Sequence, residues 1–133
     1  MPFITKDQKV QMMLAYLGYA VGTLDGIWGR NTANALMSFQ GYFGLPQTGK
    51  YDTRTFNTLH EKFMEYNYTA AGALLQLLLW YAGYDPGTID GVVGRNTKNA
   101  LMDFQSDMGL SRTAIVDSDT IWYLKNSLFP EGC

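Results

Sequence analysis

The side chains in this sequence that could take part in catalysis do not form a catalytic pattern. The single histidine, His60, and the single cysteine, Cys133, cannot supply a cluster with the spacing of zinc ligands. Asp25 and Asp90 can be considered as a carboxylate pair, but each lies in its own copy of an Asp-Gly turn, which favours a structural role. We expect His60 to be solvated, and we predict no catalytic residue, no metal site and no cofactor.

Two glycine-rich segments, Gly22–Gly29 and Gly87–Gly94, invite comparison with phosphate-binding loops. They lack the lysine and the preceding strand of such loops, so we do not expect them to bind phosphate. Their glycines instead indicate backbone torsions that a side chain would forbid. The bulky residue between the last two glycines, Trp28 or Val93, is predicted to plug the core beneath each loop.

These segments belong to an internal duplication. When the chain is shifted by 65 residues, positions 10–59 align with positions 75–124 without a gap and with 25 identities in 50 pairs. We therefore predict two tandem repeats, with residues 1–66 as the first and residues 67–133 as the second. Repeats of this size are close to the lower limit for independent folding, so we expect them to pack together.

Each repeat is predicted to contain three helices and no strand, which makes the fold class all-α. In the first repeat we expect helices at about Asp7–Leu17, after Gly29 and after Asp52, with Gly18 as a left-handed C-terminal cap. Asp52 and its counterpart Asp117 are expected to cap the third helices, and Thr69 the first helix of the second repeat. The predicted buried stripes are Val10, Met13, Leu14 and Leu17; Thr32, Ala35, Leu36 and Phe39; Phe56, Leu59 and Phe63; Leu75, Leu78, Leu79 and Ala82; Thr97, Ala100, Leu101 and Phe104; and Ile121, Leu124 and Leu128.

The first helix of the second repeat is more apolar than its own core requires. Leu74, Leu77, Trp80 and Tyr81 add to the stripe already counted. They are interpreted either as a buried seam between the repeats or as a contact surface for a partner.

Composition excludes several classes of partner. The net charge of −2 supplies no basic field, so we do not expect binding to nucleic acid. The most apolar segment, residues 74–82, is too short to span a bilayer. The N-terminus shows no basic region followed by an apolar run, so no signal peptide is predicted.

Three spaced motifs carry a resemblance to a known family. They are Val10-Gln-x-x-Leu-x-x-Leu-Gly-Tyr, then Asp25-Gly-x-x-Gly-x-x-Thr-x-x-Ala-x-x-x-Phe-Gln, then Gly44-Leu-x-x-Thr-Gly-x-x-Asp-x-x-Thr. Together they resemble the type 1 peptidoglycan-binding domain, and the resemblance extends over both repeats. The second repeat departs at its last turn, where Ala114 replaces Gly49 and Ser111-Arg112 replaces Pro46-Gln47.

The resemblance implies non-covalent binding to peptidoglycan without enzymatic activity. Such three-helix modules are attached to many bacterial and phage cell-wall hydrolases, which they place on their substrate. We therefore expect the protein to act at the bacterial cell wall or periplasm, where a hydrolase domain can be linked to it. The type of protein that fits is a phage endolysin, which is made in the host cytoplasm.

The predicted ligand-binding residues lie on the exposed face of the second helix and beside the glycine-rich turn. Arginine offers a planar fork for carboxylates, asparagine offers a donor and an acceptor for sugar hydroxyl and acetamido groups, and tyrosine offers a flat apolar face. The candidates are Tyr19, Arg30, Asn31, Asn34 and Met37 in the first repeat and Tyr84, Arg95, Asn96, Asn99 and Met102 in the second.

Other interpretations of these candidates stay open. The second-helix face that the repeats share is interpreted as a ligand groove, as part of the seam between the repeats, or as identity retained only because the duplication is recent. The two tyrosines are equally suited to the rim of the core. Gln40 and Gln105 are predicted to bond to backbone and not to ligand. The rival functions are a protein–protein interaction module that uses the second-helix face, and an enzyme whose site has no recognisable pattern.

Overall fold

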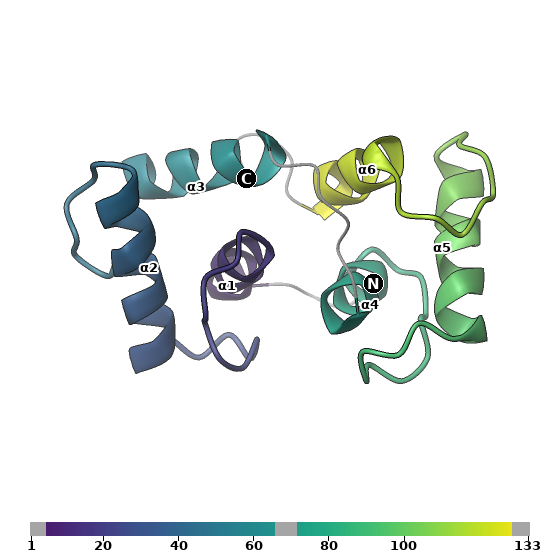
Figure 1. The fold of residues 1–133 in the computed structure, drawn as a ribbon, viewed down its shortest axis with the longest axis horizontal. Helices are drawn as coiled ribbons and strands as arrows, with labels where there is room; N and C mark the ends of the chain where they lie inside the picture. The colour runs from purple at the N-terminus through teal and green to yellow at the C-terminus, as the bar shows by residue number, and fades with distance from the viewer. Residues whose placement is uncertain (1–4, 66–71, 129–133) are drawn as a thin grey trace. The chain divides into compact units, whose positions relative to one another are not determined.

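The computed structural model describes residues 5–65 and 72–128, which form two compact units, one for each repeat (Figure 1). Over these residues the fold is all-α. The first unit contains α1 (Lys6–Tyr16), α2 (Arg30–Tyr42) and α3 (Thr53–Glu65), and the second contains α4 (Gly72–Tyr81), α5 (Arg95–Asp107) and α6 (Ser118–Leu128). The predicted helices are thus confirmed, with the first beginning one residue earlier than expected. Thr69 and the junction beyond Glu65 lie outside the described residues.

In each unit the first helix packs against the other two, so it forms the centre of the core. Val10, Leu14, Leu36 and Leu59 have no exposed surface in the first repeat, and Phe63 is also buried. The corresponding core of the second repeat consists of Leu75, Leu78, Leu79, Leu101, Phe104, Ile121 and Leu124. The predicted stripes are therefore buried, except that Leu17 is only half-buried.

The helix ends follow the predicted caps. Gly18 adopts a φ of +94°, and its N–H donates to Ala15 O at 3.1 Å while Tyr19 N–H donates to Leu14 O at 2.9 Å. This pair of bonds satisfies carbonyls that the end of α1 leaves free, and it turns the chain sharply. Gly83 and Tyr84 repeat the arrangement at the end of α4. The glycine-rich loop therefore leaves the first helix in the same direction in both repeats.

Three expectations about single side chains need adjustment. Val93 is 39% exposed, so the prediction that it plugs the core is wrong. Trp28 is half-buried: its Nε1 donates to Gly49 O at 3.2 Å, and its ring stacks edge-on against Tyr51 at 5.2 Å between centroids. Trp28 thus connects the glycine-rich loop to the loop between α2 and α3 instead of filling the core. His60 is half-buried on α3 and not fully solvated.

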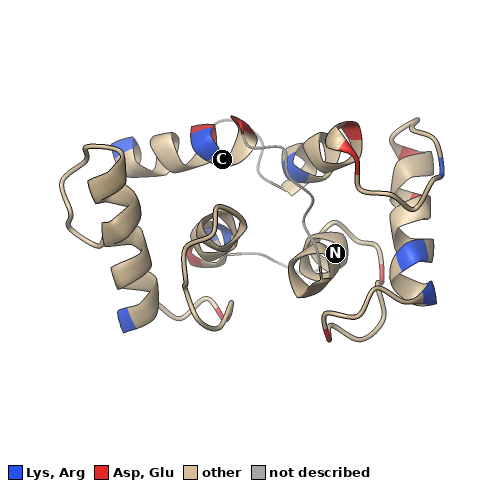
Figure 2. Cartoon of the chain, viewed as in Figure 1, with Lys and Arg blue, Asp and Glu red and all other residues tan. Residues whose placement is uncertain are grey.

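The two repeats differ in charge on the surface of the second helix. Arg30 is the only charged residue of α2, whereas α5 carries Arg95, Lys98, Asp103 and Asp107 (Figure 2). The duplicated fold therefore presents a helix with a single positive charge in the first repeat and a helix with two positive and two negative charges in the second. No helix among the described residues has the length and apolarity needed to span a bilayer.

Candidate functional site

A buried glutamine of the first helix fixes the glycine-rich loop in each repeat. Gln11 is fully buried, and its Oε1 accepts a hydrogen bond from Gly26 N–H at 2.8 Å. Its Nε2 donates to Ile27 O and to Thr32 Oγ1, each at 3.0 Å. One side chain therefore ties α1 to the loop and to the first turn of α2, and it satisfies backbone groups that water reaches poorly.

Gln76 does the same in the second repeat. It is also fully buried, its Oε1 accepts from Asp90 N–H at 3.1 Å and Gly91 N–H at 2.9 Å, and its Nε2 donates to Val92 O at 3.0 Å and Thr97 Oγ1 at 3.1 Å. The loop conformation is thus set twice by the same amide chemistry.

The fixed loop and the start of the second helix border an open hollow in each repeat, which we call the loop hollow. In the first repeat its volume is about 210 Å³, and it is lined by Val21, Thr23, Asp25, Ile27, Gly29, Arg30, Asn31 and Thr32. In the second repeat its volume is about 450 Å³, and it is lined by Pro86, Thr88, Asp90, Val92, Gly94, Arg95, Asn96 and Thr97. Each lining position of one loop hollow is matched 65 residues later by a lining position of the other.

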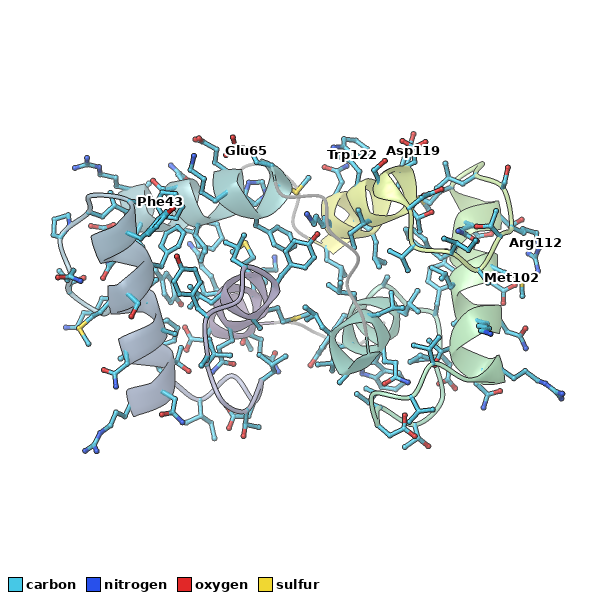
Figure 3. All side chains as sticks on the ribbon, in the orientation of Figure 1. Phe43, Glu65, Met102, Arg112, Asp119 and Trp122 are labelled. Atoms are coloured by element: carbon cyan, nitrogen blue, oxygen red, sulfur yellow. The ribbon has the colours of Figure 1, made fainter. Side chains whose placement is uncertain are left out.

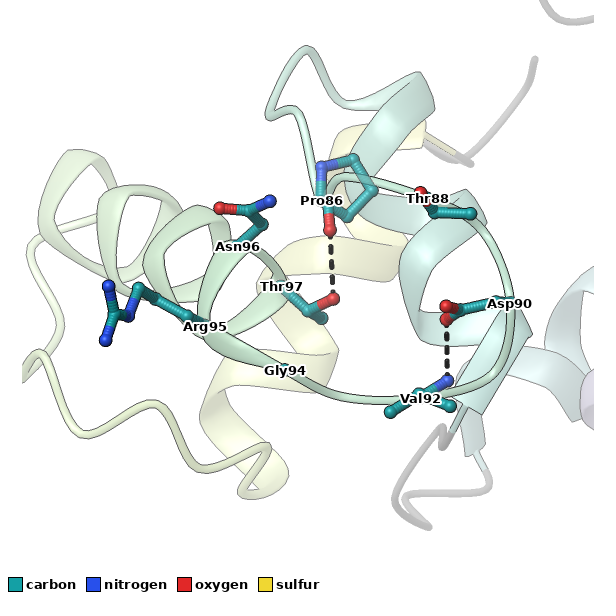
Figure 4. Close-up of a pocket in the computed structure, with 8 residues that line it drawn as sticks. All are labelled: Pro86, Thr88, Asp90, Val92, Gly94, Arg95, Asn96 and Thr97. Carbon is teal, nitrogen blue, oxygen red and sulfur yellow. Dashed lines mark hydrogen bonds between the residues drawn. The ribbon is translucent and has the colours of Figure 1, made fainter.

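Figure 4 shows how the loop hollow of the second repeat is built. Thr88, Asp90 and Val92 follow one another along the loop, every second residue facing the hollow, opposite the first turn of α5. Thr97 Oγ1 donates to Pro86 O at 3.0 Å and so closes the ring between helix and loop. The guanidinium of Arg95 points away from the loop, so Arg95 lines the hollow mainly with atoms near its backbone.

The electrostatic character of the loop hollow is mixed. Asp25 Oδ1 accepts from Ile27 N–H and Asp90 Oδ1 from Val92 N–H, each at 2.9 Å. The bond from Val92, followed by the bond from Gln76, lowers the pKa of Asp90 below its usual range, so Asp90 is ionised at neutral pH. Gly29 and Gly94 cap α2 and α5 without a side-chain hydrogen bond. A carboxylate and the positive end of a helix therefore meet in one hollow, which suits a neutral polar group better than an ion.

A second hollow of about 370 Å³ adjoins the first in the second repeat, because Asn96 lines both. Its other lining residues include Tyr84, Asp85, Asn99 and Asp103. The Tyr84 hydroxyl donates to Asp107 Oδ2 at 2.5 Å, and burial, with this bond, raises the pKa of Tyr84 to about 12. Tyr84 therefore remains a neutral hydrogen-bonding group throughout the physiological range.

The structure brings some of the predicted ligand residues together and separates others. Arg30 and Asn31 line one loop hollow, as Arg95 and Asn96 line the other, and Tyr84 and Asn99 join through the adjoining hollow. The residues outside these hollows are Tyr19, Asn34, Met37 and Met102. Asn34 is exposed on α2.

Tyr19, Met37 and Met102 each have contacts within their own repeat. The Tyr19 ring lies edge-on against Phe39, with centroids 5.8 Å apart. Met37 lies beside the second loop, because a Cβ placed on Gly49 would come 3.4 Å from Met37 Cγ. Met102 lies near Arg112, whose Nη1 is 3.5 Å from Met102 O (Figure 3). The Tyr19 ring and the Met37 side chain thus have packing partners within the first repeat.

The prediction for Gln40 and Gln105 is confirmed. Gln40 accepts from Gly49 N–H at 3.0 Å and donates to Lys50 O at 3.1 Å; Gln105 accepts from Ala114 N–H at 3.1 Å and donates to Ile115 O at 3.0 Å. Both side chains hold the second loop of their repeat and are buried, so neither is available to a ligand.

The loop residues that line the hollow were not predicted from the sequence. Thr23, Asp25 and Ile27, with their counterparts Thr88, Asp90 and Val92, were assigned to a turn and not to a site. The signal that could have found them is their spacing, since every second residue of an extended loop faces one side and the pattern recurs after 65 residues. Among the described residues, no group of three histidine, cysteine or carboxylate side chains could hold a metal ion.

Comparisons with known proteins agree with this repeat structure. The family model described as "Putative peptidoglycan binding domain" matches residues 7–59 and 72–122, once in each repeat. Over 115 residues the chain is 31% identical to a Mycobacterium tuberculosis protein named N-acetylmuramoyl-L-alanine amidase CwlM, covering 86% of the chain and 25% of that protein. Over 60 residues it is 38% identical to "Putative OxPP cycle protein OpcA" of Synechococcus elongatus, covering 45% of the chain and 14% of that protein.

The chain therefore spans a quarter or less of the length of these two relatives. No solved structure matches it. The family match extends over most of the sequence and coincides with both three-helix units. The chain belongs to the peptidoglycan-binding domain family, with one copy of the domain in each repeat.

Proposed function

We propose that each repeat binds peptidoglycan without chemical conversion and that the loop hollow is the binding site. The observation that carries this proposal is the pair of hollows lined at equivalent positions in two copies of a peptidoglycan-binding domain. Threonine, asparagine and aspartate at the rim supply the donors and acceptors that a glycan–peptide polymer needs. The ligand-binding role of the residues predicted on the second helix is part of the same proposal.

We further propose that the pair places an attached or associated hydrolase on the cell wall. The Mycobacterium relative is named as an amidase, and the chain matches a quarter of that protein's length. This name supports a link between such domains and wall-degrading enzymes. A hydrolase of the phage endolysin type fits this role, with the pair acting at the bacterial wall. The repeats themselves contribute no catalysis in this proposal.

Sedimentation with purified insoluble sacculi tests the binding. The parent protein is expected to co-sediment, and Thr23→Trp/Thr88→Trp is expected to stay largely in the supernatant because the indoles fill the loop hollows. Both threonines are exposed, so the substitutions should leave the core intact. A parent protein that does not co-sediment would contradict the wall-binding proposal and favour a protein–protein interaction module.

Two further variants refine the site. Arg30→Ala/Arg95→Ala tests the predicted arginines, and Lys50→Ala/Arg54→Ala removes the same charge from exposed positions outside the loop hollows. If both pairs of changes weaken binding equally, the effect is one of net charge and the arginines have no specific role. The turbidity of the sacculi is followed in the same tubes; a decrease with the parent protein alone would contradict the absence of catalysis.

A further inference from the structure

One apolar side chain in each loop hollow is unusually exposed. Ile27 is 69% exposed and Val92 is 67% exposed, and they occupy equivalent positions in the two repeats. A single exposed apolar residue is common on protein surfaces and by itself indicates nothing. Here, however, the residue lines a hollow beside threonine, aspartate and asparagine side chains, and the same arrangement occurs twice.

The backbone at this position is held on both sides. Ile27 N–H donates to Asp25 Oδ1 at 2.9 Å, and Ile27 O accepts from Gln11 Nε2 at 3.0 Å and from Gly29 N–H at 3.1 Å. Val92 has the same three bonds, at 2.9, 3.0 and 3.0 Å. Both residues are β-branched, which restricts their side-chain torsion. An apolar group is thus presented to solvent in a fixed position. Binding of a ligand therefore costs little side-chain conformational entropy at this residue.

The polar groups beside this side chain are exposed and available. Among the described residues, the side chains of Thr23 and Asn31 make no hydrogen bond, nor do those of Thr88 and Asn96, and all four are exposed. A hydroxyl and a carboxamide can together donate to a carbonyl oxygen and accept from an amide N–H. The carboxyl group of Asp25 or Asp90 in the same hollow disfavours a carboxylate ligand by charge repulsion.

We propose that the loop hollow recognises the acetamido group of an N-acetylated sugar. The methyl group lies against Ile27 or Val92, and the amide bonds to the threonine and asparagine side chains. This inference rests on the proposed binding of peptidoglycan, whose glycan strand carries an acetamido group on each sugar. It adds a specificity-determining role for two residues that the family assignment does not supply.

The test uses three soluble tetrasaccharide probes that differ only at nitrogen: the tetramer of N-acetylglucosamine, the same tetramer carrying N-formyl groups, and the tetramer with free amines. Affinities are measured by calorimetric or fluorescence titration. The N-formyl probe keeps the amide and lacks only the methyl group. We expect the parent protein to bind it about fourfold more weakly, the usual effect of losing one buried methyl group. The free-amine probe is titrated at high salt, which screens the attraction of its ammonium groups to the hollow carboxylates, and should then bind more weakly still.

The variant Ile27→Thr/Val92→Thr should lose most of the fourfold preference for the N-acetyl probe over the N-formyl probe, because a hydroxyl replaces part of the apolar side chain and only one methyl group remains for the contact. Ile115→Thr is the matched control, since Ile115 is 65% exposed in the second loop and lines neither loop hollow. It should keep the fourfold preference. Equal binding of the two probes by the parent protein, or an unchanged preference in Ile27→Thr/Val92→Thr, would contradict the inference.

Two outcomes separate this inference from the proposed function. If the parent protein co-sediments with sacculi but binds a soluble stem peptide instead of the N-acetylated tetramer, wall binding holds and acetamido recognition is wrong. If the parent protein binds neither sacculi nor the tetramer, the proposed function itself is wrong.

Discussion

At the scale of single residues, buried amides shape the site more than exposed charges do. Gln11 and Gln76 have no exposed surface, yet each makes hydrogen bonds to three or more groups of the loop and the second helix. Burying a polar group without hydrogen-bond partners costs free energy, so burial of these glutamines is favourable only when the loop supplies their partners. The loop and the core therefore specify each other.

The first prediction concerns these glutamines. Gln76→Leu keeps the approximate volume but leaves Asp90 N–H and Gly91 N–H without their acceptor, so we expect the free energy of unfolding to fall by about 2 to 4 kcal/mol. Urea unfolding followed by circular dichroism measures this change. Gln47→Leu is the control, because Gln47 is exposed and makes one bond, to Met37 O, and it should cost less than about 1 kcal/mol. Equal losses in the two variants would show that the loop anchor has no special weight.

The second prediction concerns the position at which the repeats exchange glycine for alanine. Ala114 has a φ of +58° and Gly49 a φ of +71°, so the second repeat keeps the left-handed turn despite the side chain. This conformation strains alanine by about 1 to 2 kcal/mol, of which the extra freedom of glycine in the unfolded chain offsets part. Ala114→Gly should therefore raise the free energy of unfolding by about 0.5 to 1 kcal/mol, and Gly49→Ala should lower it. Thermal unfolding of both variants tests this, and shifts of the same sign would contradict it.

At the scale of helices and loops, the sequence predicted what depends on local rules. Apolar spacing located the helices, and Gly18, Asp52 and Asp117 marked their ends, because capping needs only a few neighbouring residues. The loop hollow could not be predicted in this way. It depends on a buried amide of the first helix, Gln11 or Gln76, that reaches the loop from about 15 residues away. Burial of a glutamine is a tertiary property, and the apolar pattern alone does not reveal it.

The third prediction concerns the aspartates that cap the third helices. Asp52 Oδ1 accepts from Thr55 N–H and Asp117 Oδ1 from Thr120 N–H, each at 2.8 Å, and these bonds lower the pKa of both carboxyl groups. Because the folded pKa lies below the ordinary value near 3.8, their stabilisation is present above that value and is lost as the pH falls through the lowered folded pKa. Asp52→Asn/Asp117→Asn keeps a capping oxygen without titration. We expect thermal unfolding of this variant to depend less on pH below about 4 than that of the parent; identical pH profiles would contradict this role.

At the scale of the whole chain, the proposed function places two similar sites on a polymer that repeats its own chemistry. Each loop hollow is small and open, so we expect each repeat alone to bind weakly. When two weak sites occupy one polymer, the second binding event is intramolecular and raises the overall affinity without any new contact. We therefore expect duplication to have a functional consequence in addition to its structural one.

The fourth prediction follows from this doubling. Thr23→Trp or Thr88→Trp alone, which blocks one loop hollow, should weaken binding to sacculi by at least about tenfold, since avidity is lost. With a short soluble fragment of peptidoglycan that reaches one site, the same variants should lose about half of the binding capacity, with little change in affinity. Sedimentation and calorimetry provide the two measurements. If one blocked site reduces sacculus binding only by half, the repeats act independently.

The central claim is that peptidoglycan binds at equivalent loop hollows in both repeats. The most direct measurement is a titration of the isotope-labelled protein with soluble peptidoglycan fragments, followed by the NMR shifts of each backbone amide. The account predicts that the largest shifts occur at residues 21–32 and 86–97 and that they disappear in Thr23→Trp/Thr88→Trp. Shifts concentrated on α3 and α6, or an unchanged pattern in that variant, would contradict it.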